Sequence, residues 1–176
     1  MPHQLAPTQT YWNHANYTVP PENVPLIEKC FATLLPWEQF IKREGFLGYR
    51  LQKDNRMGGI YIFAADEATM FERAIARLRK TDKELDASIE KLSLRDANVA
   101  DHFGFMMPSL AEWKRRLDLM ERSEKEHPDW KVKVLKVRRP GDPDSAAAGD
   151  IFEAFVRFGL LGPMRNVLEM QGLINT

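Results

Sequence analysis

The sequence has little that would place it outside a reducing compartment. It contains a single cysteine, Cys30, so it forms no intramolecular disulfide. Cys30 lies in a helical pattern beside Phe31 and is expected to pack as a small hydrophobic residue. Residues 1–8 lack the basic and apolar regions of a secretory signal. These features predict a cytoplasmic protein.

The sequence also lacks an excess of charge of either sign, and it lacks long apolar runs. The 25 basic and 25 acidic residues give a formal net charge of zero, so no overall field favours nucleic acid or an anionic membrane. No apolar run approaches the roughly 20 residues of a membrane span. We therefore expect neither nucleic acid nor membrane as a partner. With 176 residues and 44% hydrophobic content, the chain suits one domain or two small modules with a shared core.

Two segments of the chain begin in the same way. They are WNHANYTVP at residues 12–20 and ADHFGFMMP at residues 100–108. In each, a histidine (His14, His102) opens a strand-like run and a proline follows six residues later, before an amphipathic helical stretch. A duplicated unit is the simplest explanation.

Hydrophobic periodicity predicts the same order of elements, β-α-β-β-β, in both halves. The first half has strands at 12–19, 37–42, 46–53 and 59–64 and a helix at 24–35. The second has strands at 101–107, 131–138, 151–158 and 166–171 and a helix at 109–126, with a capping box from Ser109 to Glu112. We expect a tail at 1–11, modules at 12–65 and 100–173, and a helical linker at 66–99 whose charged face is solvated. For residues 139–149 we favour an exposed loop over a mobile lid.

The β-α-β-β-β repeat, the openings NHANYTVP (13–20) and DHFGF (101–105), and the closing VLEM (167–170) together resemble the vicinal oxygen chelate superfamily. That group includes glyoxalase I, extradiol dioxygenases, fosfomycin-inactivating transferases and bleomycin-binding proteins. The resemblance covers residues 12–172. It implies an α+β fold in which two βαβββ modules form a curved, cup-shaped mixed sheet with helices outside.

Two histidines and a mid-strand carboxylate make a candidate metal site. The resemblance implies that His14, His102 and Glu169 are the ligands. Such a set suits Fe(II) or Mn, also takes Zn, Ni or Co, and leaves coordination positions open. The fourth position of the family falls on Tyr61 or Ile62, where no carboxylate stands, so Tyr61 is the candidate catalytic acid or hydrogen-bond donor.

Strand alternation groups the residues that would line the cup beside the ligands. It turns His14 and Asn16 to one face and Tyr17 to the other. The candidate substrate-binding residues are Asn16, Arg50, Arg157 and Gln171. Arginines in a concave site favour an anionic substrate. The alternative for Glu153 and Arg157 is cross-strand pairing on an exposed sheet face.

The resemblance thus implies a metal-dependent enzyme of the vicinal oxygen chelate type, dioxygenase-, lyase- or transferase-like. Its substrate would be a small, oxygen-bearing, anionic metabolite. The alternative is a metal-free protein that sequesters an aromatic or drug-like ligand in the same cup. A third interpretation is an interaction module that engages a partner through the charged helices of residues 67–94. A homodimer is possible in each case, since the cup could close within one subunit or between two.

Overall fold

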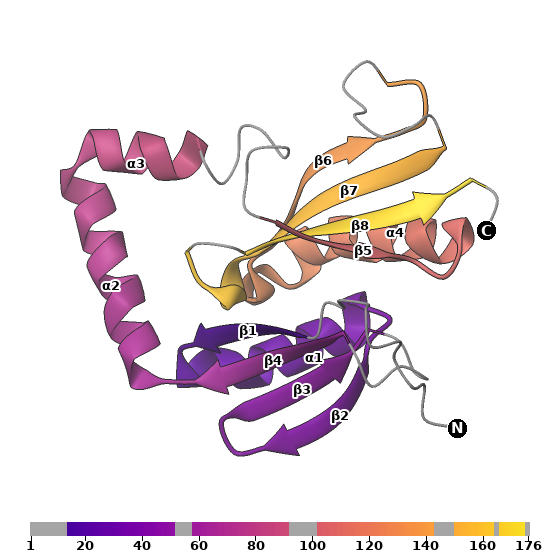
Figure 1. The fold of residues 1–176 in the computed structure, drawn as a ribbon. Helices are drawn as coiled ribbons and strands as arrows, with labels where there is room; N and C mark the ends of the chain where they lie inside the picture. Colours follow the sequence, from indigo (N-terminus) through magenta and orange to yellow (C-terminus); the bar gives the residue numbers. More distant parts are fainter. Residues whose placement is uncertain (1–13, 52–57, 92–101, 143–149, 164–165, 175–176) are drawn as a thin grey trace, which may run out of the picture.

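The computed structural model describes residues 14–51, 58–91, 102–142, 150–163 and 166–174. Its elements follow the predicted order (Figure 1). The first half contains β1 (His14–Val19), α1 (Val24–Leu34), β2 (Glu38–Arg43), β3 (Phe46–Arg50) and β4 (Gly59–Ala64). The second contains β5 (His102–Met106), α4 (Leu110–Glu126), β6 (Val132–Arg138), β7 (Ile151–Phe158) and β8 (Val167–Leu173). The helices α2 (Asp66–Thr81) and α3 (Lys83–Glu90) connect the two halves.

Each half builds a mixed, four-stranded sheet, with strand orders β1-β4-β3-β2 and β5-β8-β7-β6. The first and last strands of each half pair in parallel, and the other pairs are antiparallel. The α+β class and the two βαβββ modules are therefore confirmed. The duplication extends to fine detail, because β2 and β6 carry a register shift at the same place, between Gln39 and Ile41 and between Val134 and Lys136.

Local signals set the helix ends. Helix α1 stops at Leu34 because Leu35, which precedes Pro36, is extended. Helix α4 begins where the Ser109 hydroxyl accepts a hydrogen bond from the Glu112 amide at 3.1 Å. The predicted capping box is only half formed, since the Glu112 carboxylate turns to Arg115 and Arg116.

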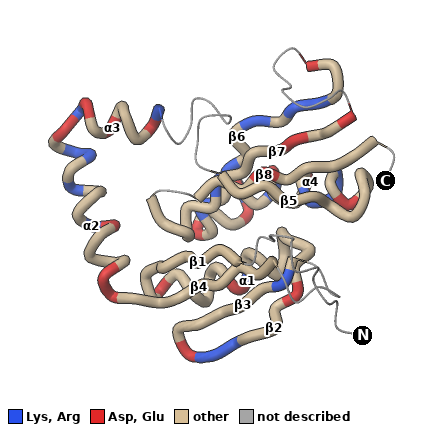
Figure 2. The backbone as a smooth tube through the Cα atoms, viewed as in Figure 1, with Lys and Arg blue, Asp and Glu red and all other residues tan. Residues whose placement is uncertain are grey.

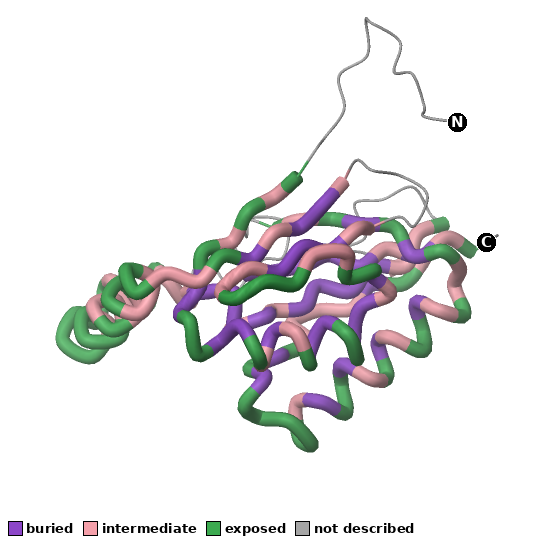
Figure 3. Tube along the Cα trace, turned by 90° about the horizontal axis from the view of Figure 1, so that it is seen from below, coloured by how far each residue is buried: buried purple, intermediate pink, exposed green. Residues whose placement is uncertain are grey.

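The two halves share one apolar core on the side of the sheets covered by α1 and α4 (Figures 1 and 3). Ring contacts cross between the halves: Phe31 meets Phe158 with centroids 5.7 Å apart, and Trp37 meets Phe105 at 5.1 Å. Cys30 is buried there as a free thiol, as expected. Burial raises the pKa of that thiol to about 12.

Helices α2 and α3 lie to one side of both sheets (Figure 1) and contain no buried residue. The apolar stripe of α2 is largely exposed, with Met70 at 69% and Phe71 at 49%. Within the described part of the chain, no helix has the length and apolar character needed to cross a membrane.

Truncation of the shared core should destabilise both halves together. We expect Phe31→Ala to lower the free energy of unfolding by about 3–5 kcal/mol, because it leaves a cavity among three aromatic partners. Urea denaturation should still show one transition. The control Met70→Ala, at an exposed site, should cost less than about 0.5 kcal/mol. Two separate transitions in the wild type would contradict a shared core.

An ion-pair network joins α4 to α1. Hydrogen bonds from Arg115 and Arg116 lower the pKa of Glu112 to about 2, and Arg116 also donates to the Thr33 carbonyl at 2.8 Å. A carboxylate whose pKa is lowered by folding stabilises the protein above its unfolded pKa, and this contribution disappears as the pH falls toward the folded value.

We therefore expect Glu112→Gln to cost about 1 kcal/mol at about pH 7, a value reduced for solvent screening. The difference from wild type should shrink steadily toward about pH 2, where the wild-type carboxyl is itself protonated. Urea denaturation across this range measures it. A difference that does not change with pH would show that Glu112 ionises equally in the folded and unfolded chain.

Candidate functional site

The open face of each sheet, defined here as the side away from α1 and α4, carries the candidate site. Alternation along β4 buries Ile60 and Ile62 in the shared core and leaves Tyr61 and Phe63 on the open face. Likewise, β8 turns Met170 to the core and Glu169 to the open face, as predicted from the sequence.

The open face of the second sheet holds a histidine–carboxylate pair. His102 Nε2 lies 3.1 Å from Glu169 Oε2, and Gln171 donates a hydrogen bond to Glu169 Oε1 at 2.7 Å. Gly104 is opposite Glu169 in the register, and a Cβ atom there would lie 3.1 Å from Oε2. The glycine therefore leaves the carboxylate room beside β5. The His102 ring stands edge-on to Phe155 at 5.5 Å.

A second ionic pair lies next to the first. Arg138 is 1% exposed and Glu153 is 5% exposed, with Arg138 Nη1 3.4 Å from Glu153 Oε2. Burial raises the pKa of the Glu153 carboxyl, and so does neighbouring Glu169, whereas Arg138 lowers it. The cross-strand pair suggested for Glu153 is thus present, but it is buried rather than on an exposed face, and Arg157 makes no ion pair with the described residues.

Among the described residues, this group has more acidic than basic buried side chains. Two buried carboxylates, Glu153 and Glu169, face one guanidinium, that of Arg138. Buried charge without compensation is costly. The raised pKa of Glu153 favours its protonated, neutral form, which lowers this cost.

The open face of the first sheet is aromatic instead. The His14 ring meets Tyr61 edge-on at 5.6 Å, and Tyr61 also contacts Phe40 and Phe46. Phe46 in turn stacks on Phe63 at 4.6 Å. Gly48 makes this packing possible, because a Cβ atom there would lie 3.3 Å from the Phe40 ring. We call Phe40, Phe46, Tyr61 and Phe63 the aromatic wall.

The strand registers make the two halves of the site equivalent. Tyr61 pairs with Asn16 and Gly48, and Glu169 pairs with Gly104 and Phe155 at the matching places. His14 lies two residues before Asn16, the partner of Tyr61. His102 likewise lies two residues before Gly104, the partner of Glu169. The register thus selects Tyr61, not Ile62, as the counterpart of Glu169. Figure 2 shows the contrast between the uncharged strands β1 and β4 and the charged strands β6 and β7.

The three predicted metal ligands do not meet within one chain. No three His, Cys, Asp or Glu side chains of the described residues form a cluster that could hold a metal. The physical reason is that His14 begins β1 and His102 begins β5, which are edge strands of two separate sheets. The structure brings together His102 and Glu169, and it places His14 with Tyr61.

The candidate substrate-binding residues lie in different surroundings. Gln171 supports Glu169, Asn16 is exposed on β1, and the Arg50 guanidinium lies 4.5 Å above the Phe40 ring. Arg157 lines a cavity beside α2. The loop at 139–149 lies mostly outside the described residues, so its role as a lid stays a prediction.

Sequence reasoning missed Arg138 and the aromatic wall. The basic residues Lys133, Lys136 and Arg138 of β6 pair with residues that lie on one face of β7. Because of the register shift at Leu135, these three basic residues are not all spaced two apart in the sequence. Alternation alone does not reveal such a bulge. The aromatic spacing of Phe46, Tyr61 and Phe63 was available in the sequence as a signal.

Solved structures of related architecture are similar to the chain over nearly its whole length. They include a lactoylglutathione lyase from Agrobacterium tumefaciens (14% identity, 94% of this chain and 95% of that chain, TM-score 0.48). Also similar is a glyoxalase/bleomycin resistance protein/dioxygenase family enzyme from Burkholderia phytofirmans (10% identity, 92% of this chain and 97% of that chain, TM-score 0.49). A third is a putative glyoxalase family protein from Bacillus anthracis (13% identity, 96% of this chain and 99% of that chain, TM-score 0.49). No family model and no curated protein matches the chain. Similarity at this level assigns no activity to it.

Proposed function

We propose that the protein is a small-molecule enzyme of the vicinal oxygen chelate type, built around the His102–Glu169 pair. The observation that carries the proposal is the 3.1 Å approach of His102 Nε2 to Glu169 Oε2, next to the buried Arg138–Glu153 pair. A shifted pKa such as that of neighbouring Glu153 is typical of functional sites. The buried, free Cys30 suits a cytoplasmic location.

The pair fits two neighbouring positions of a divalent transition metal. Nitrogen and oxygen ligands lie about 2.1 Å from such an ion, so two ligands at right angles lie about 3 Å apart. Fe(II) or Mn suits an imidazole–carboxylate set, and Zn, Ni or Co also fits. A metal bound there would supply Lewis-acid stabilisation of negative charge on vicinal oxygens of the substrate. Gln171 would hold Glu169 in place for this role.

The third ligand, in this proposal, is His14 of a second copy of the chain. The equivalence of the His14–Tyr61 and His102–Glu169 pairs supports a site that joins one half from each subunit of a homodimer. Phe63 and Met106 are 40% and 48% exposed, which is apolar area that a second copy would cover. Tyr61 would then serve as hydrogen-bond donor, and Asn16 would line the substrate site.

The substrate we propose is a small, oxygen-bearing anionic metabolite. Support comes from Arg157 and Lys133, which are opposite each other in the register of β6 and β7 and make no ion pair with the described residues. A guanidinium without a partner favours a carboxylate or phosphate group. Ring cleavage, isomerisation, elimination and group transfer are all compatible with this set of residues.

Metal content tests the proposal directly. Protein purified without a metal-affinity tag, reconstituted with Fe(II) or Mn and analysed for bound metal should hold about one ion per chain. His14→Ala, His102→Ala and Glu169→Ala should each lose it, because a facial site needs three protein ligands. The control His127→Ala removes an exposed histidine that stacks on Trp130, and it should retain the metal.

Mixing the variants then locates the third ligand. In a dimer of one His14→Ala chain and one Glu169→Ala chain, one of the two sites is intact. Random exchange of subunits should therefore restore roughly one quarter of the wild-type metal content. If mixing restores no metal while the wild type binds it, the ligands come from one chain. If the wild type binds no metal after reconstitution, the metal proposal is wrong.

The alternative function is a metal-free binding protein, and the aromatic wall favours it. Its rings are partly exposed, and Arg50 lies over Phe40. Aromatic rings stack on flat apolar ligands, and a guanidinium can pair with an acidic group on the same ligand. This combination is suited to sequestering an aromatic acid.

Titration with 2-naphthoate tests the alternative. If the wall is the binding surface, Phe46→Ala should raise the Kd about tenfold, since it removes stacking worth about 1–1.5 kcal/mol. The control Phe71→Ala, which removes an exposed ring on α2, should leave the Kd unchanged. Equal effects of the two substitutions would argue against a specific aromatic site.

A further inference from the structure

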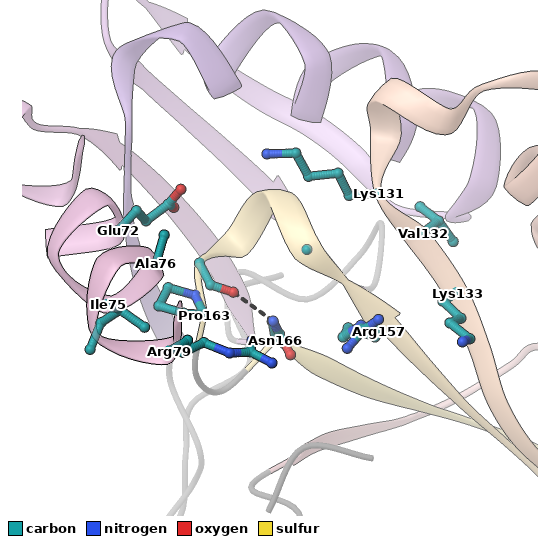
Figure 4. A pocket seen from close by; sticks show the side chains of 12 residues that line it. Glu72, Ile75, Ala76, Arg79, Lys131, Val132, Lys133, Arg157, Pro163 and Asn166 are labelled. Carbon is teal, nitrogen blue, oxygen red and sulfur yellow. Dashed lines mark hydrogen bonds between the residues drawn. The ribbon is translucent and has the colours of Figure 1, made fainter. Parts of the chain in front are cut away.

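A cavity of about 410 Å³ lies between α2 and one end of the second sheet (Figure 4). This volume is typical of sites for small molecules. Helix α2 contributes Glu72, Ile75 and Arg79 to one wall. The opposite wall comes from the start of β6, the end of β7 and the residues just before β8.

Unpaired positive charge dominates the sheet side of the cavity. Lys131, Lys133 and Arg157 line it and make no ion pair with any residue that the structure describes. Arg79, by contrast, is held by Asp86 at 2.6 Å and by Glu90. Figure 4 shows Lys131 extending toward the α2 side. Three cations around one cavity repel each other, and a bound anion would relieve that repulsion.

Glu72 is the one acidic side chain among the described lining residues. Its Oε1 atom is buried and has no hydrogen-bond partner among the described residues. Burial raises the pKa of this carboxyl, while nearby Lys131 lowers it. A buried polar atom without a partner is costly, and a hydroxyl group of a ligand would satisfy it.

We propose that this cavity binds a small oxyanion, a carboxylate or phosphate, through Arg157 and Lys133, with a hydroxyl of the same molecule paired to Glu72. The guanidinium of Arg157 matches the planar geometry of such a group. A small apolar cluster on the sheet consists of Phe155, Val167 and Leu135. Val167 of this cluster pairs with both Arg157 and His102, and Phe155 pairs with Glu169. The inference deepens the proposed function, where Arg157 and Lys133 already support an anionic substrate; it rests on the cavity and its charges, and not on a metal at His102.

Calorimetric titration at constant ionic strength tests the anion site with three probes: inorganic phosphate, acetate and glycolate. Arg157→Gln and Lys133→Gln should each raise the Kd of the bound anions about tenfold, the loss of one charge-assisted hydrogen bond. Arg77→Gln is the matched control, because it removes a charge from α2 outside the cavity. Absence of saturable binding, or an equal loss in Arg77→Gln, would overturn the site. Phosphate binding without glycolate binding would assign the site to phosphate, and the reverse to carboxylates.

The role of Glu72 has its own comparison. Wild type should prefer glycolate over acetate about tenfold because of the hydroxyl, and Glu72→Ala should abolish this preference. A preference that survives in Glu72→Ala would overturn the pairing.

Anion binding should also slow amide hydrogen exchange in residues 66–81, since the ligand joins α2 to the sheet. The same slowing in His102→Ala would separate this site from the metal proposal, and no slowing in either protein would exclude a ligand between α2 and the sheet.

Discussion

The parallel pairing of the first and last strands in each half is the constraint on which the site depends. Because β1 lies beside β4, His14 comes next to Tyr61, and because β5 lies beside β8, His102 comes next to Glu169. The same pairing leaves β1 and β5 at the edges of their sheets. The histidines therefore lie on edge strands, and both are exposed among the described residues.

Much of this was accessible from the sequence because it depends on local periodicity. The alternation of Ile60, Tyr61 and Ile62 fixes which side faces the core, and Ser109 fixes the start of α4. The separation of His14 from Glu169 was not accessible. It follows from how the two sheets are placed by packing such as Phe31 against Phe158, and ring contacts between distant segments have no periodic signature.

The two halves have kept their backbone register while their open faces have diverged. Tyr61 in the first half corresponds to Glu169 in the second, and Phe46 corresponds to Glu153. Rings satisfy one another by stacking, so the first face needs no counter-charges. Buried carboxylates need them, and this explains why Arg138 is almost completely buried beside Glu153. One open face is therefore lined by rings and the other by charged groups.

The buried charged groups of the second face influence one another. Arg138 pairs with Glu153, whose carboxyl also lies near Glu169. Burial and the neighbouring carboxylate raise the pKa of Glu153, whereas Arg138 lowers it. Gly104 leaves space beside the oxygen of Glu169 that faces His102. The cluster thus holds two carboxylates close together beside one guanidinium, and the protonation of Glu153 is coupled to the charge of Glu169.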